Sequence, residues 1–460
     1  MAIIRNRELI EKGIPVELIS SCIKEHQESI DRLNMLDNYY MGKHAILERP
    51  SDEDKGLPNN MLVANHAKYI TDIATGYVFG KPVKYEGEKI ESILQAYKAI
   101  DITSKDSELA KDLSTFGIGF ELHFMSREDV PIPKIAVVDP RQIFLVVDDT
   151  VEYKPMFGVH YYEKRDVDNK VIGYNVNVYT ENQILRYTIK DVDSKDFAEG
   201  ESNSHFYKAV PIVEYWNNEE QQGDFEQQLS LIDAYNVLQS DRVNDKEQLV
   251  DAILKVSGFS FGDDEEETFA TARLLKKLKI LEMPDAGANA EWLTKNLNEA
   301  EVEILKDSIS NDIHRFAMVP MLADENFGGN SSGVAMKYKL FGTEQLAVIK
   351  ERYFIQGLRE RLQLFSNILG VKGKETGVTD VIITMVRNLP ENDLTIQELV
   401  SLVDQVSDET LLTQIPFVED AAEEFKRLIK QRAEKTKRIQ SEFGFPMDPP
   451  EDVKVDEEAE

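Results

Sequence analysis

The amino-acid sequence predicts an α+β protein that is mainly helical. Apolar residues recur three to four positions apart through most of the chain, which is the spacing of one helix face. Residues 119–215 instead carry short β-branched and aromatic runs separated by Asp, Asn, Gly and Pro, a pattern typical of strands and turns. The chain has 460 residues, which is more than one hydrophobic core usually serves, so we expect more than one sub-domain.

The N-terminal quarter is predicted to be helical. Pro15 marks the start of a second helix within the first helical stretch, because its fixed φ suits a first helical turn. Residues 43–60 form a polar connector. The Gly-Lys-Pro sequence at 80–82 ends the next helix, which is expected at 61–79. The helices are expected at residues 5–42, 61–79, 88–98 and 104–114.

The strand-rich region is expected to form a mostly antiparallel sheet structure. Its clearest strands are the runs at 135–138, 143–147, 157–162 and 176–179, each bounded by turn-forming residues. Residues 191–204 are polar and acidic, and we expect a mobile loop there.

Two long helices, at residues 225–256 and 298–318, are predicted to flank a small mixed insert at 257–296. The insert contains an acidic run at 263–267 and a basic run at 273–279. The simplest interpretation is a solvated loop followed by a helix with its leucines buried. The alternative is a charged contact for a partner.

A Gly/Asn/Ser loop at 324–333 separates these helices from a very long helix at 334–369, which would span roughly 50 Å at 1.5 Å per residue. A strand is expected at 380–386. The remainder is predicted to be helical at 395–406, 408–413 and 419–443, before an acidic tail that we expect to be disordered.

The charge balance argues against a protein that grips DNA over a wide surface. The chain has 84 Asp and Glu against 53 Lys and Arg, a net charge of −31. Binding to duplex phosphates depends on a basic surface. The single cysteine, Cys22, excludes an intrachain disulfide, and we expect it to be a small helical residue rather than a nucleophile. The N-terminus has no long apolar segment, so we expect no secretion signal, and no stretch approaches about 18 uninterrupted apolar residues, so we expect no membrane span.

The sequence carries none of the common catalytic or ligand-binding motifs. It lacks a phosphate-binding Gly-x-x-x-x-Gly-Lys-Ser/Thr loop, a His-Glu-x-x-His pair and a Gly-x-Ser-x-Gly turn. Its seven histidines show no spacing suited to metal binding. We therefore expect no catalytic residue, no metal and no cofactor. An enzyme with a dispersed acidic metal site remains the main alternative.

The order of elements, together with four sequence segments, resembles the SPP1-type portal protein family of tailed bacteriophages that infect Gram-positive hosts. The segments are Asn59 to Ile70 with Thr75 to Val83, Asn330 to Lys337, Ile383 to Pro390, and Ser407 to Leu412 with Ile415 to Val418. Each segment is a weak signal alone, but their order together is a strong signal. The resemblance covers most of the chain.

The resemblance implies an architecture of wing, stem, clip and crown regions assembled as a ring. The implied regions are a wing at 1–224 with its β-rich part at 119–215, stem helices at 225–256 and 298–318, a clip at 257–297, a tunnel loop at 319–333, a wing-spanning helix at 334–369, a strand returning to the wing at 370–390, and a crown with the acidic tail at 391–460.

The resemblance also implies a function. Such a protein is a virion component at the capsid portal vertex, assembled in the host cytoplasm, and not an enzyme. As a homododecamer it forms the channel through which double-stranded DNA is packaged and ejected. The implied partners are the large and small terminase subunits, scaffold and major capsid proteins, and head-completion or tail connector proteins, with no membrane contact. A structural adaptor ring without a DNA role is the second alternative.

The candidate site residues follow from these regions. The tunnel loop is expected near DNA, through Asp324, Glu325, Asn326, Phe327, Gly328, Gly329, Asn330, Ser331 and Ser332. Lys337 and Lys339 are candidates for weak DNA contacts. In the clip, the candidates for terminase or connector contacts are Asp263, Asp264, Glu265, Arg273, Lys276, Lys277 and Lys279.

Overall fold

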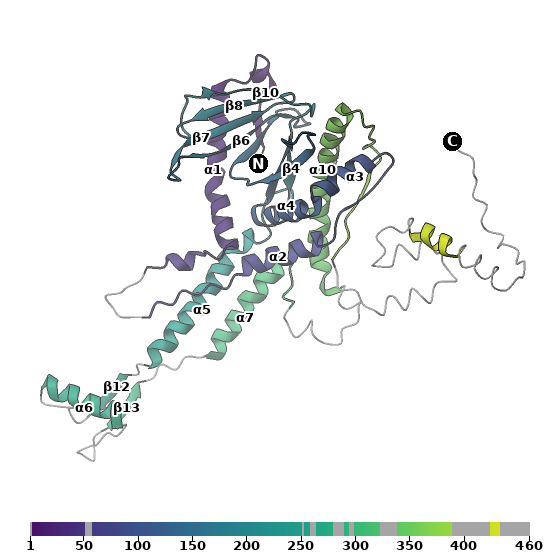
Figure 1. The fold of residues 1–460 in the computed structure, drawn as a ribbon. Coiled ribbons are helices and arrows are strands. Elements are labelled where there is room, and N and C mark those ends of the chain that lie inside the picture. Colours follow the sequence, from purple (N-terminus) through teal and green to yellow (C-terminus); the bar gives the residue numbers. More distant parts are fainter. Residues whose placement is uncertain are drawn as a thin grey trace, which may run out of the picture. The chain divides into compact units, whose positions relative to one another are not determined.

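The computed structural model describes residues 2–50, 58–250, 253–257, 264–278, 289–293, 299–322, 338–388 and 424–432 (Figure 1). The chain divides into two units, Met1–Asn388 and Leu389–Glu460. The first unit mixes helices and strands, as the sequence predicts. In the second, the described residues 424–432 form one helix, inside the helix predicted at 419–443.

The N-terminal region is helical, with two corrections to the prediction. Residues Ile3–Arg5 form a strand, β1, because they pair in parallel with residues of β5, and a 3-10 helix follows at Arg7–Ile10. The first long helix begins directly after Pro15, as expected. The helices are α1 (Val16–Tyr40), η2 (Ala45–Glu48), α2 (His66–Phe79), α3 (Glu91–Ala99) and α4 (Ile102–Phe116).

The β-rich region forms a seven-stranded and a three-stranded sheet. The seven-stranded sheet runs β1-β5-β6-β7-β8-β10, with β9 also paired to β8, and only the β1–β5 pair is parallel. The other sheet runs β11-β3-β4 and is antiparallel. The strands are β3 (Ile118–Met125), β4 (Pro133–Val138), β5 (Ile143–Asp148), β6 (Pro155–Arg165), β7 (Val171–Tyr179), β8 (Gln183–Ile189), β9 (Ala198–Glu199), β10 (Asn203–Ser204) and β11 (Ile212–Trp216).

The loop expected at 191–204 is therefore partly ordered by strand pairing. Residues of β9 and β10 both pair with β8, which gives the end of this acidic segment a defined place on the sheet. Sequence polarity alone did not reveal this, because short edge strands need no apolar alternation.

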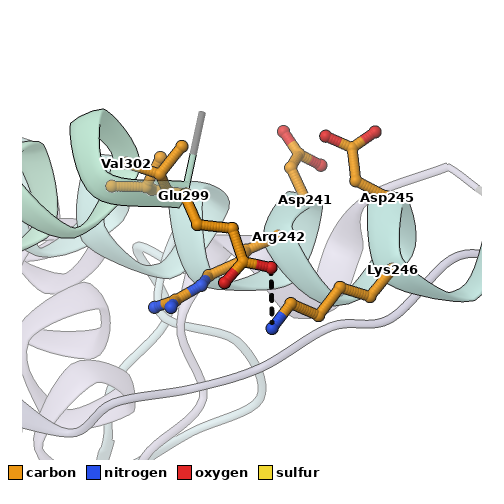
Figure 2. A pocket seen from close by; sticks show the side chains of 7 residues that line it. Asp241, Arg242, Asp245, Lys246, Glu299 and Val302 are labelled. Atoms are coloured by element: carbon orange, nitrogen blue, oxygen red, sulfur yellow. Dashed lines mark ion pairs between the residues drawn. The ribbon is translucent and has the colours of Figure 1, made fainter. Parts of the chain in front are cut away.

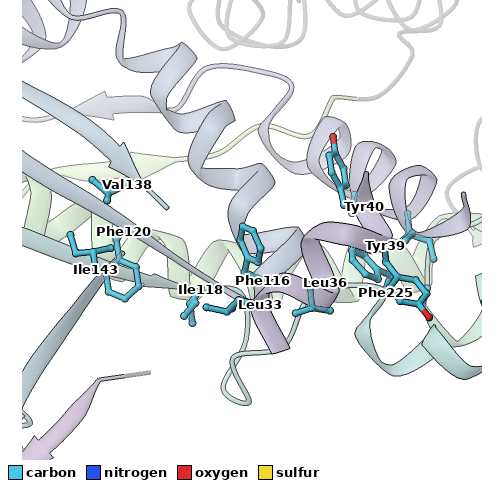
Figure 3. Packing of buried hydrophobic residues seen from close by; sticks show 14 of the residues in the cluster. Leu33, Leu36, Tyr39, Tyr40, Phe116, Ile118, Phe120, Val138, Ile143 and Phe225 are labelled. Atoms are coloured by element: carbon cyan, nitrogen blue, oxygen red, sulfur yellow. The ribbon is translucent and has the colours of Figure 1, made fainter. Parts of the chain in front are cut away.

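Among the described residues, two of the hydrophobic clusters position the N-terminal helices on the sheets. One joins α1 to the seven-stranded sheet through residues such as Ile19, Ile23, Phe144 and Phe157. Cys22 is buried in it, and burial raises the pKa of its thiol to about 11, which suits the expected structural role. The second cluster joins α1, α2 and α4 to the start of α5 (Leu229–Val250) and to the end of α7 (Glu299–Phe316). Figure 3 shows its part around Leu33, Phe116 and Phe225.

The second half of the unit contains two long helices with a small insert between them. They are α5 (Leu229–Val250) and α7 (Glu299–Phe316), and the described parts of the insert are β12 (Ile253–Ser257), α6 (Glu265–Leu278) and β13 (Asn289–Leu293). The predicted helix to residue 256 is thus too long. The run Ile253–Ser257 has β-forming residues and pairs antiparallel with Asn289–Leu293, so these residues form a strand instead of continuing the helix.

The longest helix, α10 (Phe341–Val371), matches the prediction at its C-terminal end. Residues 334–337 lie outside the described residues, and Tyr338 and Lys339 form a separate helical turn before α10. Strand β14 (Ile382–Thr384) falls within the expected strand and pairs with β2 (Lys84–Glu86). The helices predicted at 395–406 and 408–413, and the acidic tail, lie outside the described residues.

Candidate functional site

Helices α5 and α7 form an antiparallel hairpin that leads from the core to the insert (Figure 1). Ion pairs join the two helices where they face each other. Arg242 Nη1 lies 2.7 Å from Glu303 Oε2, and Lys246 Nζ lies 3.3 Å from Glu299 Oε1. A small hollow between the helices is lined by Leu238, Asp241, Arg242, Asp245, Lys246, Glu299 and Val302 (Figure 2).

The chemistry of this hollow favours helix pairing over ligand binding. Its cations Arg242 and Lys246 already face carboxylates on the opposite helix. Hydrogen bonds from Lys306 and Arg242 lower the pKa of Glu303, so this carboxylate stays ionised near neutral pH. All these side chains are partly exposed, and exposed ion pairs contribute little to stability individually. We call these two ion pairs, Arg242–Glu303 and Lys246–Glu299, the hairpin seam. The seam therefore aligns the two helices more than it stabilises the fold.

An extended segment before α2 runs along the other side of α5. Three of its backbone N–H groups, on alternate residues, donate to side chains that are four residues apart on α5. The bonds run from Asn60 to Asn244 Oδ1 (2.7 Å), from Leu62 to Ser240 Oγ (3.0 Å) and from Ala64 to Asn236 Oδ1 (2.8 Å). We call residues 60–64 the strap.

The strap fits α5 because two residues of the strap advance about as far as four residues of the helix. Two residues of extended chain advance about 6.6 Å, and four residues of α-helix advance about 6 Å. Asn236, Ser240 and Asn244 are all buried, so their polar groups need the partners that the strap supplies. Arg49 adds an ion pair to α5 from Nη1 to Asp241 Oδ1 at 2.6 Å.

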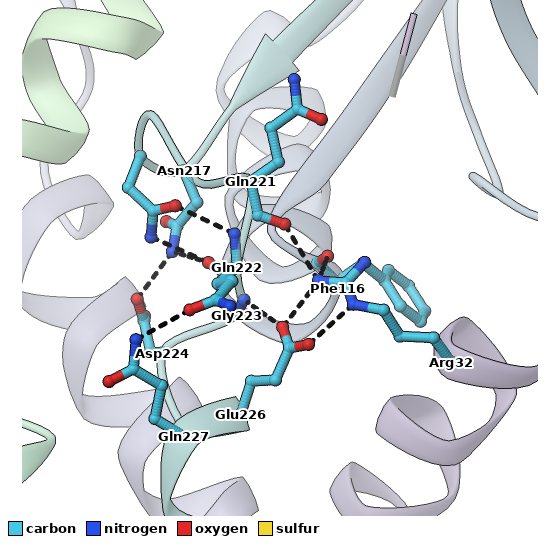
Figure 4. A network of polar contacts seen from close by, with 10 residues as sticks. Arg32, Phe116, Asn217, Gln221, Gln222, Gly223, Asp224, Glu226 and Gln227 are labelled. Atoms are coloured by element: carbon cyan, nitrogen blue, oxygen red, sulfur yellow. Dashed lines mark hydrogen bonds and ion pairs between the residues drawn. The ribbon is translucent and has the colours of Figure 1, made fainter. Parts of the chain in front are cut away.

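The inner end of α5 is fixed by a polar network around the turn that precedes it (Figure 4). Arg32 donates to Glu226 Oε1 (2.6 Å) and to the backbone oxygen of Gln221 (2.9 Å). Gly117 allows this turn to approach β3: its φ is +83°, and a Cβ there would lie 2.2 Å from the Gln221 oxygen. Asn217 Nδ2 donates to Asp224 Oδ1 (2.8 Å) in the same turn.

A histidine pair joins α2 to α7 beside α5. His66 Nδ1 and His314 Nε2 are 3.1 Å apart, and His314 Nδ1 is 3.0 Å from the Val319 carbonyl oxygen. A carbonyl oxygen only accepts, so the network assigns the His314 proton to Nδ1 and makes His66 Nδ1 the donor within the pair. Burial and the neighbouring His314 lower the pKa of His66 to about 4, and burial lowers the pKa of His314. Both rings are neutral near pH 7.

Helix α10 is anchored to the core by buried charges. Lys350 pairs with Asp224, and both side chains are almost fully buried. Arg361, which is 0% exposed, forms ion pairs with Asp106 and Glu121. Burial alone would raise the pKa of the Glu121 carboxyl, but the positive charge of Arg361 holds this pKa at about 2.

Close backbone contact and a third charge cluster complete the α10 anchor. A Cβ at Gly357 would lie 2.4 Å from the Tyr215 ring, so only glycine lets α10 pack this closely on β11. After β14, Arg387 Nη2 lies 2.6 Å from Glu351 Oε2 and its Nε lies 3.1 Å from Glu344 Oε2. Tyr77 donates to the same Glu344 carboxylate.

Most of the predicted DNA-proximal residues cannot be placed. Asp324, Glu325, Asn326, Phe327, Gly328, Gly329, Asn330, Ser331, Ser332 and Lys337 lie outside the described residues. Lys339 is described, and it is exposed in the helical turn before α10. These assignments stay predictions.

Of the predicted insert contacts, three are described with their side chains. Asp264 precedes α6 and accepts a hydrogen bond from the Glu267 backbone N–H at 2.8 Å. This is the N-cap geometry of an Asp-x-x-Glu sequence, which the printed sequence could have revealed. Glu265 and Arg273 are exposed on α6. Lys276 and Lys277 lie on α6 without a described side-chain position, and Asp263 and Lys279 lie outside the described residues.

The described parts of the chain hold neither a metal-binding cluster nor a membrane-spanning helix. No group of three or more His, Cys, Asp or Glu side chains there is arranged to hold a metal ion. Among the described helices, none has the length and apolar character needed to cross a bilayer.

Within the unit Met1–Asn388, the fold and site define a scaffold protein: a helical hairpin with an insert between its helices, anchored in an α+β core. Residues 19–438 match the model of the family described as "Phage portal protein, SPP1 Gp6-like". The chain therefore belongs to this phage portal protein family, which confirms the resemblance inferred from its sequence.

Two portal proteins of named phages agree with this assignment. The chain is 22% identical over 441 residues to the portal protein of Clostridium phage phiCD119, a match covering 88% of this chain and 94% of that protein. It is 25% identical over 398 residues to the portal protein of Bacillus phage SPP1, covering 82% and 76%. Among solved structures, the neck of an empty GTA particle aligns with a TM-score of 0.40 and 12% identity over 79% of this chain and 88% of the other.

Proposed function

We propose that this chain is the subunit of a ring-shaped channel at the capsid vertex of a phage, through which double-stranded DNA is packaged and later ejected. The family match over residues 19–438 carries the proposal. The anchored α5/α7 hairpin supports it, because a ring of identical subunits needs an element that repeats rigidly around an axis.

In this proposal the described elements take the family's regions. The wing contains α1 to α4 and both large sheets, and the hairpin forms the stem. The insert with β12, α6 and β13 is the clip, residues 319–333 are the tunnel loop, α10 spans the wing, and residues 391–460 form the crown. The stem helix at its clip end stops at Val250 rather than at residue 256.

The net charge of −31 suits a conduit. A wall that attracted phosphates over its whole length would slow translocation, whereas a mainly repulsive wall lets the duplex slide. We expect acidic side chains to dominate the lumen of the ring, and a separate terminase motor to supply the ATP hydrolysis. The chain itself has no enzymatic role in this proposal.

Mass and shape in solution test this function directly. We expect the purified full-length protein to form rings of about a dozen subunits with an open pore in negative-stain electron micrographs. A monomer that shows enzymatic turnover would contradict the proposal. Rings whose pore is too narrow for a duplex would support an adaptor role instead.

Two variants test the region assignments. Deleting Phe327 to Asn330 from the tunnel loop should leave rings intact but reduce DNA packaging, and normal packaging would refute the role of the loop. Reversing the charges of Lys276, Lys277 and Lys279 should weaken terminase binding to intact rings. Unchanged binding would show that the terminase docks elsewhere.

A further inference from the structure

The helix at residues 424–432 is strongly basic within an acidic chain (yellow in Figure 1). Its sequence is Glu-Phe-Lys-Arg-Leu-Ile-Lys-Gln-Arg, with four cations and one carboxylate, which gives a net charge of 4 − 1 = +3 over nine residues. The whole chain carries −31. Residues 424–432 are therefore positively charged although the chain as a whole is negatively charged.

The cations of this helix face solvent. Lys426 and Lys430 are four residues apart, so they lie on one face, and both are exposed. Arg427 is exposed beside them and pairs with Glu424 at 3.4 Å. Phe425 and Leu428, by contrast, are partly buried.

The exposure of the basic and the apolar side chains indicates which partner this helix could bind. A helix that binds a membrane surface must insert its apolar side chains into the bilayer. Of the three apolar side chains of this helix, Phe425 and Leu428 are partly covered and Ile429 is 38% exposed, which leaves little apolar surface to insert, while the lysines remain available. Lysine is a flexible point charge that contacts phosphates without reading base sequence, which suits DNA of any sequence.

We propose that the helix at 424–432 is a binding site for the phosphate backbone of double-stranded DNA, with Lys426 and Lys430 as the contacting residues. The proposal rests on the proposed function, because the duplex that passes a portal ring is the polyanion that this helix would meet. It places a DNA contact in the C-terminal unit, separate from the tunnel loop.

The test uses full-length protein and a short fluorescent DNA duplex of random sequence, with binding measured by fluorescence anisotropy at a series of salt concentrations. The variant Lys426→Gln with Lys430→Gln removes two phosphate contacts per subunit. We expect about tenfold weaker binding at low salt, and a slope of log K against log salt that is smaller by about 1.8 for each helix engaged.

The matched control is Lys12→Gln with Lys98→Gln, which removes the same charge from two exposed positions in the unit Met1–Asn388. It should bind like the unmodified protein, and Lys426→Arg with Lys430→Arg should also retain binding. Equal loss in the Gln variant and the control would show a net-charge effect only and would overturn the proposal. So would unchanged binding in the Gln variant, or no binding by the unmodified protein.

Ring formation separates this inference from the proposed function. Each protein is also examined by negative-stain microscopy. If rings form and the Gln variant binds DNA normally, the inference fails and the portal function stands. If the unmodified protein forms no ring, the portal function is the part in question, while the anisotropy result still decides whether the helix binds DNA.

Discussion

Helix α10 and the α5/α7 hairpin are both held by ion pairs, but the two sets lie in different surroundings. Lys350 and Arg361 of α10 are at most 2% exposed, whereas Lys246 in the hairpin is 52% exposed. Buried charges are costly to leave without a partner, and exposed pairs are screened by water and salt. Helix α10 is therefore fixed to its core, and the hairpin obtains its position mainly from the strap and the network at its base.

The largest effect is expected where a buried pair is broken. Arg361→Leu leaves the Glu121 and Asp106 carboxylates without their cation, which should reduce the free energy of unfolding by about 3–5 kcal/mol. Urea unfolding followed by circular dichroism measures this change. Arg359→Leu, an exposed neighbour on the same helix, is the control and should change stability by less than about 1 kcal/mol. Equal losses in the two variants would remove the distinction between the regions.

Acid should also weaken the core before it weakens the hairpin seam. His26 is buried against Tyr161 and the Pro140 carbonyl, and burial lowers its pKa from 6.5 to about 4. Because the folded-state pKa is lowered, the unfolded chain binds the proton first. Stability is fully present above pH 6.5 and falls as the pH is lowered towards 4, by on the order of 3 kcal/mol for this residue.

The variant His26→Gln isolates this contribution. It should be less stable at pH 7, yet its stability should fall less steeply between pH 6.5 and 4 than that of the unmodified protein. Urea unfolding at several pH values gives both slopes. Parallel slopes would mean that His26 takes up a proton in the folded protein at its ordinary pKa.

An intermediate effect is expected at the strap. Ser240→Ala removes the acceptor for the Leu62 backbone N–H, which should cost about 1 kcal/mol. Hydrogen exchange of the Leu62 amide should accelerate as well, because this variant frees that N–H. Ser230→Ala removes an exposed hydroxyl from the same helix and serves as the control. No change in exchange would show that the strap is held by other contacts.

The smallest effect is expected in the hairpin seam. Lys246→Gln removes the exposed pair with Glu299 and should change stability by less than about 1 kcal/mol, with any loss disappearing at high salt. Thermal unfolding at low and high salt measures it. A loss as large as that of Arg361→Leu would mean that the seam, rather than the strap, positions the hairpin.

The sequence predicts the long helices, the β-rich character of residues 119–215 and the strands that became β4 to β7 and β14, because their apolar repeats are local. It does not predict the anchors of α10, since Lys350 and Arg361 lie within a helical pattern and their partners Asp224 and Glu121 are 126 and 240 residues away. The strand at Ile253–Ser257 was missed because a short apolar run fits either a helix or a strand. Pairing with residues 289–293 decides it.

The candidate site was predicted less completely than the fold. The hairpin and its insert follow from the order of elements, but the strap does not, because its bonds use backbone N–H groups that carry no sequence signal. Asp264 also caps α6, a structural role that was not predicted, and its role as a partner contact stays a prediction. The tunnel-loop residues stay a prediction.

The coincidence of repeats between the strap and α5 also limits how the two segments can change length during evolution. Inserting one residue between Asn60 and Ala64 would reverse the alternation beyond the insertion, so the N–H groups there that face α5 would point away from it. Two added residues in the strap keep the pattern only if α5 gains about four, close to one helical turn. Hairpins of different length in related chains should therefore differ in coupled steps of these sizes.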